Sequence, residues 1–306
     1  MQHAQQKLKS LLNQLNTVIV GKSTQVQDCV ACLLAGGHLL IEDVPGVGKT
    51  TLAHALAHTF GLQFSRVQFT SDLMPSDVSG HAVYDPKTES FKIRRGPVFT
   101  NLLLADEINR APAKTQSALL EVMQEGQVTI EGKAFVLSPP FLALATQNPV
   151  EQEGTYPLPE AQLDRFLLRL ALGYPDAAAE RALLSGVDRR DLIAQVSPLL
   201  AAEQVISLRR AVQDVHASDA LIGYVQALVS RSRSHPGVRV GLSPRAGLAL
   251  LKGARAHALL LGRDHVLPED VQALFAPVAS HRLVPEAEAS AAQALAKSIL
   301  HAVAVD

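Results

Sequence analysis

The first half of the chain alternates short apolar runs with helical patterns. Each of five runs is too short for a helix and is flanked by turn or polar residues, which indicates a buried β-strand. These runs are residues 38–41, 66–69, 101–105, 141–145 and 167–172. Strands that alternate with helices are typical of a parallel sheet covered on both faces by helices. We therefore expect an α/β fold, an αβα sandwich around a five-stranded parallel sheet.

The pattern changes at about residue 173, beyond which only helical patterns occur. Examples are LIGYVQALVSRS, SPRAGLALLKGARAHALLLG and PEDVQALFAPVASHRL. The sequence thus predicts an α/β domain over residues 1–172 and an all-helical domain over 173–306. Between the second and third strands, a stretch rich in Pro, Gly and Asp, residues 71–97, is longer than a simple connection requires. It predicts a functional insertion.

Composition narrows the function classes. The 306 residues suffice for two domains, and the net charge of −1 gives no overall attraction to nucleic acid or anionic membrane. No apolar run approaches the roughly 20 residues that span a bilayer, and the polar start has no signal-peptide pattern. Cys29 and Cys32 form a C-x-x-C pair without a second pair, which favours two small core residues over a redox or zinc site. We expect a cytoplasmic protein without membrane insertion.

The stretch DVPGVGKTT follows the first predicted strand and matches G-x-x-x-x-G-K-[ST] except at its first position, Asp43. Glycines let backbone N–H groups turn inward around phosphate, where side chains would clash. Lys49 supplies positive charge for the β and γ phosphates, and the Thr50 hydroxyl is a Mg²⁺ ligand. The helix that begins here directs its positive end at the anion. The predicted phosphate-binding residues are Val44, Pro45, Gly46, Val47, Gly48, Lys49, Thr50 and Thr51.

A pair of acids follows the third predicted strand in NLLLADEINRAP. Asp106 is expected at the carboxyl edge of the sheet, where a Mg²⁺-water ligand is required, and Glu107 can polarise a water for attack on the γ-phosphate. By itself Asp-Glu after a strand also fits a solvated strand end, but together with the loop it predicts hydrolysis.

Three further polar residues are candidates for the reaction. Asn148 follows the fourth strand and could reach both the attacking water and the γ-phosphate if this strand lies between the first and third; a turn-forming Asn before Pro149 is the alternative. Arg165 in LPEAQLDRF and Arg245 in GLSPRAGLALL could stabilise developing phosphate charge. Spacing alone leaves open whether each is instead a surface ion-pair residue.

The chain resembles the AAA+ ATPases, and within them the MoxR family, from VIVGKSTQVQ to about residue 282. The distinctive stretches are EDVPGVGKTTLAHALA, RVQFTSDLMPSDVSG, GPVFTNLLLADEINRAPAKTQSALLEVMQEGQVTI, ATQNPVEQEGTYPLPEAQLDRFLLR and GLSPRAGLALL. An aspartate at the position of Asp43 is common in this family. The resemblance implies an AAA+ core followed by a helical lid.

The resemblance also implies a role for each matching residue. Val20 and Gly21 belong to the adenine end, Lys49 and Thr50 hold phosphate and Mg²⁺, and Asp106 is the second Mg²⁺ group.

For hydrolysis, the resemblance makes Glu107 the water-activating base and Asn148 the first sensor. Arg245 is the second sensor, acting from the lid on the γ-phosphate, and Arg165 is the arginine finger that enters a neighbouring subunit's site. Alternative fingers are Arg94, Arg95 and Arg110. The insertion at 71–97 resembles an element that lines the pore of a ring; it contains His81, where a smaller hydroxyl residue is expected.

The implied function is Mg²⁺-dependent ATP hydrolysis by a homo-oligomeric ring, with six subunits as the family expectation. Family members resemble chaperones that remodel or mature protein clients, including metal or cofactor loading, often with a von Willebrand factor A domain partner. One alternative is a nucleic-acid motor, for which Lys92, Arg94 and Arg95 form the only compact basic tract and which the neutral net charge disfavours. Another is a non-hydrolysing scaffold, which Glu107 argues against.

Overall fold

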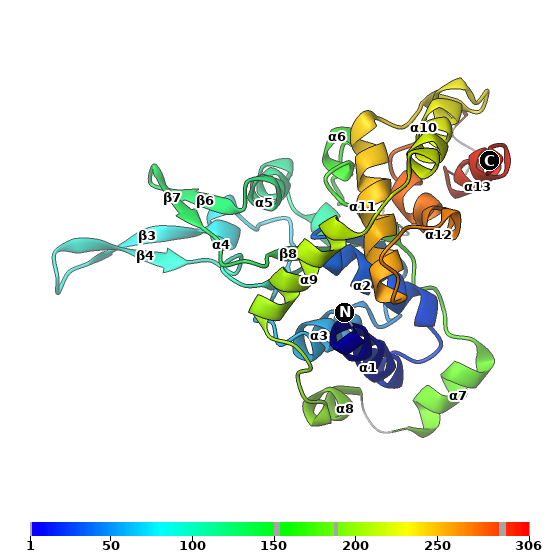
Figure 1. The fold of residues 1–306 in the computed structure, drawn as a ribbon. Coiled ribbons are helices and arrows are strands. Elements are labelled where there is room, and N and C mark those ends of the chain that lie inside the picture. Colours follow the sequence, from blue (N-terminus) through cyan, green and yellow to red (C-terminus); the bar gives the residue numbers. More distant parts are fainter. Residues whose placement is uncertain (1, 150–153, 187–188, 288–291, 306) are drawn as a thin grey trace.

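The computed structural model describes residues 2–149, 154–186, 189–287 and 292–305. Its centre is a five-stranded sheet with the order β2-β5-β8-β1-β9, in which every neighbouring pair is parallel (Figure 1). The strands are β1 (Leu39–Glu42), β2 (Phe64–Gln68), β5 (Leu102–Asp106), β8 (Leu142–Gln147) and β9 (Leu168–Leu170). All five predicted strands are confirmed, with ends that differ by up to two residues.

Alternating strand residues belong to two different hydrophobic cores. Leu39 and Ile41 pack in one core, whereas Leu40 between them packs in the other. Leu102 and Leu103 divide between the cores in the same way. Because successive side chains of a strand point to opposite faces, both faces of the sheet are covered. The predicted αβα sandwich is therefore confirmed.

Helices of the first half of the chain contribute buried residues to both cores. The first core includes buried residues of α1 (Gln2–Val18), α2 (Ser23–Leu34) and α3 (Lys49–Thr59), and the second includes those of α5 (Ala113–Glu125). Two short helical turns also lie in the first half, η1 (Ile108–Arg110) after β5 and α6 (Glu160–Leu163) before β9.

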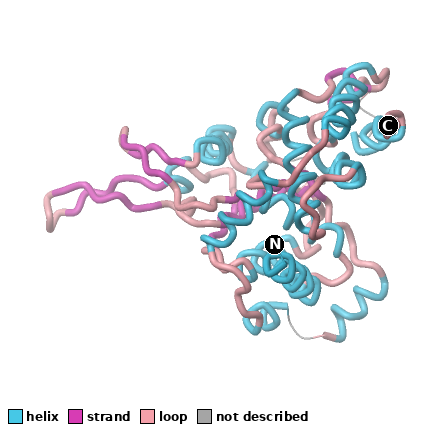
Figure 2. Tube along the Cα trace, viewed as in Figure 1, coloured by secondary structure: helices cyan, strands magenta, loops and turns pink. Residues whose placement is uncertain are grey.

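Two antiparallel hairpins project from the sheet away from the later helices (Figures 1 and 2). The first lies in the predicted insertion and consists of β3 (Gly80–Asp85) and β4 (Ser90–Arg95), preceded by α4 (Pro75–Ser79). The second pairs β6 (Gln127–Ile130) with β7 (Lys133–Val136) and was not predicted. The turn of this hairpin consists of Glu131 and Gly132, whose φ angles are both positive, at 49° and 73°, as this type of two-residue turn requires. The glycine is the feature of the sequence that could have indicated the turn.

Helices dominate the second half of the chain, as predicted. They are α7 (Ala177–Ser185), α8 (Arg189–Gln195), α9 (Ala202–Asp214), α10 (Asp219–Ser234), α11 (Pro244–Leu260), α12 (Pro268–Ala279) and α13 (Ala292–His301). The prediction of an all-helical domain is wrong in one detail, because β10 (Val238–Val240) pairs with β11 (Val284–Pro285). Strands of two or three residues are too short to produce a periodic pattern.

The later helices also pack on the first half. Helix α8 contacts α1 and α3, while α9 and α11 contact α2. A division at residues 172 and 173 therefore stays a prediction about the chain's organisation. Among the described residues, no helix combines the length and apolarity that crossing a membrane demands.

Helix α2 joins the two halves and carries buried polar chemistry. Cys29 and Cys32 are buried and unbridged, so the prediction of two core residues is confirmed. Asp28 beside them is 6% exposed. Burial raises the pKa of Asp28 to about 7, although the charge of His257 on α11 opposes this shift.

Replacing Asp28 by asparagine should stabilise the protein at alkaline pH. Because the folded pKa of this acid lies above its unfolded value, the folded state binds the extra proton, and wild-type stability falls as pH rises towards 7 and beyond. The difference in free energy of unfolding between Asp28→Asn and wild type should grow in favour of the variant by about 3 kcal/mol between pH 5 and pH 8. Urea unfolding at several pH values measures it; a difference independent of pH would contradict the prediction.

Candidate nucleotide site

The phosphate loop connects β1 to α3 at the carboxyl edge of the sheet. Gly46 and Gly48 have φ angles of 84° and 93°, a left-handed conformation that glycine adopts freely. No atom of the described residues lies within 4 Å of a Cβ built on either, so both positions face open space. Such a turn before a helix N-terminus directs backbone N–H groups at an anion. Helix α3 begins at Lys49 and places Thr50 and Thr51 in its first turn.

The lysine of the loop is held in place within its own chain. Lys49 Nζ donates a hydrogen bond to the backbone oxygen of Asp43 at 2.7 Å. Burial lowers the pKa of Lys49, and the nearby charges of Asp43, Asp106 and Glu107 partly oppose the shift. The structure therefore brings the loop lysine within electrostatic range of both strand-end acids.

Asp43, the departure from the usual loop motif, has a structural function. Its side chain is buried, and its Oδ1 accepts a hydrogen bond from the Val44 N–H at 2.9 Å. Its Oδ2 accepts one from the Gly173 N–H at 2.6 Å. The carboxylate therefore ties the start of the loop, ahead of Pro45, to the segment that follows β9. A glycine here would leave both bonds unmade.

β8 lies between β5 and β1, which is the strand order that the expected role of Asn148 requires. Asp106 at the end of β5 and the phosphate loop after β1 therefore lie at the same edge of the sheet, two strands apart. Asp106 is the last residue of β5 and is 8% exposed. Its Oδ1 accepts a hydrogen bond from the Thr146 hydroxyl at 2.6 Å. Its Oδ2 accepts two from the Arg66 guanidinium, at 3.2 and 2.7 Å.

Glu107 has a left-handed backbone, with φ 55°, which is uncommon for a residue with a side chain. Its N–H donates to the Thr146 hydroxyl at 2.8 Å, which helps to fix this turn. Its Oε2 accepts hydrogen bonds from Gln68 Nε2 at 2.8 Å and from Arg110 Nη1 at 3.0 Å. The turn at the strand end thus directs two successive acids to different partners.

Three residues of this network were missed in the sequence: Arg66, Gln68 and Thr146. Arg66 and Gln68 lie two positions apart on β2 and so share a face of the strand. The sequence could have indicated them, because polar residues at the carboxyl end of a strand are expected near the acids at the end of a neighbouring parallel strand. Thr146 has the same signal on β8.

The donors present fit a divalent cation of the Mg²⁺ type. A carboxylate on Asp106 and a hydroxyl on Thr50 are hard oxygen ligands, which Mg²⁺ prefers together with water and phosphate oxygens. The open space bordered by Gly46 and Gly48 leaves room for the phosphates beside them. Among the described residues, no cluster of three or more His, Cys, Asp or Glu offers an all-protein metal site.

Asn148 directly follows β8 and is 5% exposed. It lines a cavity of about 260 Å³ together with Glu42 and Asn109. It therefore lies at the same edge of the sheet as Asp106 and the loop. Residues 150–153 of the stretch ATQNPVEQEG lie outside the described residues.

A second cavity, of about 410 Å³, extends from the loop to the segment before α2. Val20 lines it together with Gly46, Val47, Gly48 and Thr51, and so does the exposed ring of Tyr174. The family resemblance implies that the adenine end of a nucleotide lies at Val20 and Gly21, and Val20 lines this cavity.

Gly21 has a φ of 73°, and an added Cβ would come within 2.7 Å of Ala179 Cβ. Glycine is therefore required both by the turn and by the close approach of α7.

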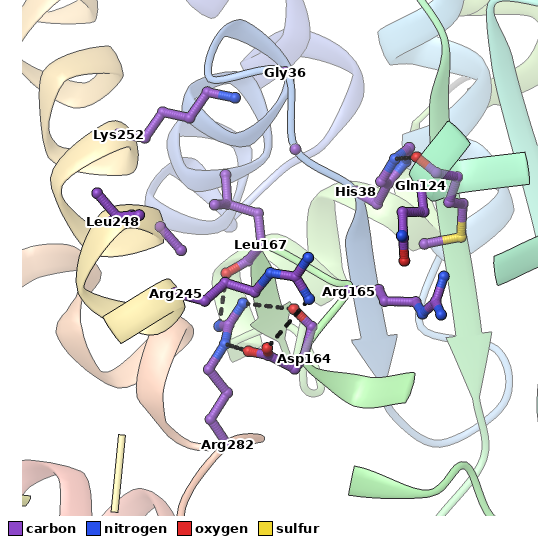
Figure 3. A pocket seen from close by; sticks show the side chains of 13 residues that line it. Gly36, His38, Gln124, Asp164, Arg165, Leu167, Arg245, Leu248, Lys252 and Arg282 are labelled. Atoms are coloured by element: carbon purple, nitrogen blue, oxygen red, sulfur yellow. Dashed lines mark hydrogen bonds and ion pairs between the residues drawn. The ribbon is translucent and has the colours of Figure 1, made fainter. Parts of the chain in front are cut away.

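The structure places the two candidate arginines together, away from their own phosphate loop. Arg165 and Arg245 line one cavity of about 340 Å³, in which Asp164 lies beside Arg245 and Arg282 (Figure 3). His38, at the opposite end of β1 from the loop, lines it too. At about 3.3 Å per residue, β1 separates this amino edge from the loop by about 15 Å.

Arg245 does not lie beside the phosphate loop of its own chain, and its role as the second sensor stays a prediction. Arg245 lies at the start of α11 and forms an ion pair with Asp164 at 3.7 Å. Arg165 donates to the Leu120 oxygen at 2.8 Å. The reason is that α11 begins near the end of α2, since Lys252 of α11 lines the same cavity as Gly36, two residues beyond α2.

The alternative arginines and His81 lie elsewhere. Arg110 is paired with Glu107. Arg94 and Arg95 are exposed on β4, where Arg95 lies 5.0 Å from the ring centre of Phe99. His81 is exposed on β3, opposite Arg94, and nothing in the structure explains it.

The sheet order, the phosphate loop and the strand-end acids together define a P-loop NTPase of the AAA+ class. Family models support this: residues 38–168 match the ATPase family associated with various cellular activities (AAA), and residues 230–301 match an AAA lid domain.

Known relatives narrow the class. The chain is 49% identical to protein YeaC of Bacillus subtilis, over 97% of this chain and 94% of that one, and 43% identical to the chaperone MoxR1 of Mycobacterium tuberculosis, over 90% and 75%. A crystal structure of a candidate ATPase from Cytophaga hutchinsonii is 39% identical, with a TM-score of 0.92 over 99% of this chain and 96% of that one. The chain belongs to the MoxR family of AAA+ ATPases.

Restoring the usual loop glycine should harm this protein. Asp43→Gly removes the acceptor of the Gly173 N–H, and an unmade buried hydrogen bond costs about 1–3 kcal/mol of unfolding free energy. Asp43→Asn keeps the shape and one acceptor oxygen, so it should lose less. Urea unfolding of the three proteins at pH 7 tests this. An Asp43→Gly protein as stable as wild type would show that the tie is dispensable.

Proposed function

We propose that this protein is a Mg²⁺-dependent ATPase whose active sites are completed between subunits of a homo-oligomeric ring. The observation that supports this most directly is the convergence of Lys49, Asp106 and Glu107 at one edge of the sheet. A nucleotide switch does not need the second acid, but a hydrolase does.

The proposal gives each residue a role that its position supports. The backbone from Val44 to Thr51 and the Lys49 ammonium hold the phosphates, and Thr50 and Asp106 hold the cation. Mg²⁺ supplies neutralisation of phosphate charge when bound. Glu107 orients and deprotonates the attacking water once it is released from Gln68 and Arg110.

Three further positions complete the proposed site. Asn148 positions the water beside the γ-phosphate. The cavity next to Val20 and Gly21 accepts the adenine.

Arg165 and Arg245 both act on a neighbour's nucleotide in this proposal. They line one cavity at the edge opposite their own loop, so a triphosphate reaches them only from a second copy of the chain. In a closed ring, one face of each subunit meets a different face of the next, which repeats this arrangement at every interface. The proposed ring has six subunits, the expectation for this family.

The work done by hydrolysis is proposed to be chaperone-like remodelling or maturation of a protein client. Support comes from a relative named as a chaperone, and from the two projecting hairpins, which offer a surface distant from the helices of the second half. Metal or cofactor loading and a von Willebrand factor A domain partner are finer expectations from the family resemblance.

The nucleic-acid alternative loses part of its basis. Lys92, one of three cations in its basic tract, is ion-paired with Asp85 within the same hairpin. Binding to a phosphate backbone is driven mainly by unpaired cations. The surface of the hairpin also carries exposed Phe91 and Tyr84, in edge contact with each other.

A Glu107→Gln protein should bind ATP normally and hydrolyse it at least about 100-fold more slowly, because the amide has nearly the same shape but does not accept the water's proton. Lys49→Ala should lose binding itself. Phosphate release and equilibrium binding of a fluorescent ATP analogue separate the two effects. Hydrolysis at the wild-type rate by Glu107→Gln would assign the base elsewhere.

Mixing inactive variants distinguishes sites within a subunit from shared sites. Lys49→Ala and Arg245→Ala proteins should each be inactive, but a 1:1 mixture should regain activity at about a quarter of its interfaces, where an intact loop meets an intact arginine. If Arg245 acted within its own chain, no subunit in the mixture would be complete and activity would stay absent. The same test applies to Arg165→Ala, and Lys49→Ala mixed with Glu107→Gln is the inactive control.

A further inference from the structure

Arg66 makes a contact that the proposed reaction does not use. Its guanidinium reaches from β2 to the neighbouring strand and bonds Asp106 Oδ2 through Nε and Nη2, at 3.2 and 2.7 Å. The other oxygen, Oδ1, is occupied by the Thr146 hydroxyl at 2.6 Å. Both oxygens of the proposed cation ligand are thus engaged by groups of this chain.

The same arginine is connected to the second acid. Its Nη2 also donates to Gln68 Oε1 at 2.9 Å, and Gln68 Nε2 donates to Glu107 Oε2 at 2.8 Å. Gln68 lies directly opposite Asp106 in the parallel ladder. The carboxyl end of β2 therefore contacts both acids, and Arg66 supplies the positive charge of this arrangement.

We propose that Arg66 is an internal counter-cation that leaves Asp106 when a divalent cation binds, and that it thereby weakens cation affinity. This inference rests on the proposed role of Asp106 as a cation ligand. Two adjacent acids repel each other, and the guanidinium reduces that repulsion while no cation is bound. A guanidinium and a divalent cation at the same carboxylate repel each other, so Arg66 is lost from Asp106 when the cation is gained.

Arg66 is suited to leave. Its side chain is 46% exposed, whereas that of Asp106 is 11% exposed. β2 is an edge strand of the sheet, with β5 as its one neighbour in it. A long side chain at an open edge can turn into water, where its charge is well solvated. Lys49, by contrast, is partly buried and bonded to the backbone of its own loop.

Cation binding tests the proposal independently of hydrolysis. The probe is Mn²⁺, titrated into protein saturated with ADP, with free Mn²⁺ measured by electron paramagnetic resonance. Arg66→Gln should lower the dissociation constant of Mn²⁺ about threefold to tenfold, since a partly exposed ion pair and its charge are removed. Arg66→Lys keeps the charge without the two-point contact, so its affinity should lie between those of wild type and Arg66→Gln.

The matched control is Arg239→Gln, which removes an exposed arginine from β10 and should leave Mn²⁺ affinity unchanged. Unfolding temperatures give a second readout. Without Mn²⁺, Arg66→Gln should melt at a lower temperature than wild type. Added Mn²⁺ with ADP should raise the melting temperature of Arg66→Gln by more than it raises that of wild type.

Mn²⁺ binding by Arg66→Gln that is unchanged or weaker than that of wild type would overturn the proposal. If Arg66→Gln fails to fold, Arg66→Lys decides: an affinity for Mn²⁺ no higher than that of wild type would overturn the proposal. Asp106→Asn separates this failure from that of the proposed function. It should weaken Mn²⁺ binding about tenfold or more. If it does not, Asp106 is no cation ligand; if it does while Arg66→Gln matches wild type, only the role of Arg66 is lost.

Discussion

The site depends on the parallel pairing of β5, β8 and β1, which sends three strand ends to a single edge of the sheet. Because the three strands run in one direction, the acids after β5, the amide after β8 and the loop after β1 come together although about 100 residues of sequence separate Asn148 from the loop. Thr146 strengthens this arrangement. Its hydroxyl donates to Asp106 and accepts from the Glu107 N–H, so β8 holds the acid-bearing turn directly.

Parallel pairing also places a second group of residues at the opposite edge of the sheet. Residues that precede β1 and β9 lie at the opposite edge, where Arg165 and Arg245 share a cavity. A subunit with these two arginines at one edge and the phosphate loop at the other is asymmetric, as the proposed head-to-tail association requires. The start of α11 lies near the end of α2, and this brings Arg245 to that edge.

Much of this could be predicted from the sequence. The five strands are continuous apolar runs, because both faces of a parallel sheet are buried, and the loop motif has a rigid spacing that a sequence displays directly. The location of Arg245 could not be predicted, since it depends on how α11 packs, and helix periodicity gives the buried face of a helix without its partner. The hydrogen bonds from Gly173 to Asp43 and from Arg66 to Asp106 were missed for a similar reason, because they join residues 130 and 40 positions apart.

The tether between Asp43 and Gly173 gives the loop a mechanical connection to the rest of the molecule. Gly173 lies in the connection between β9 and α7. Its N–H donates a hydrogen bond of 2.6 Å to the Asp43 carboxylate at the start of the loop. A displacement of this connection would therefore strain or break one short hydrogen bond to the loop, and so would a displacement of the loop. A glycine at this position has no side chain that could form this bond; here a carboxymethyl group in place of one hydrogen links the position of the loop to that of the connection between β9 and α7.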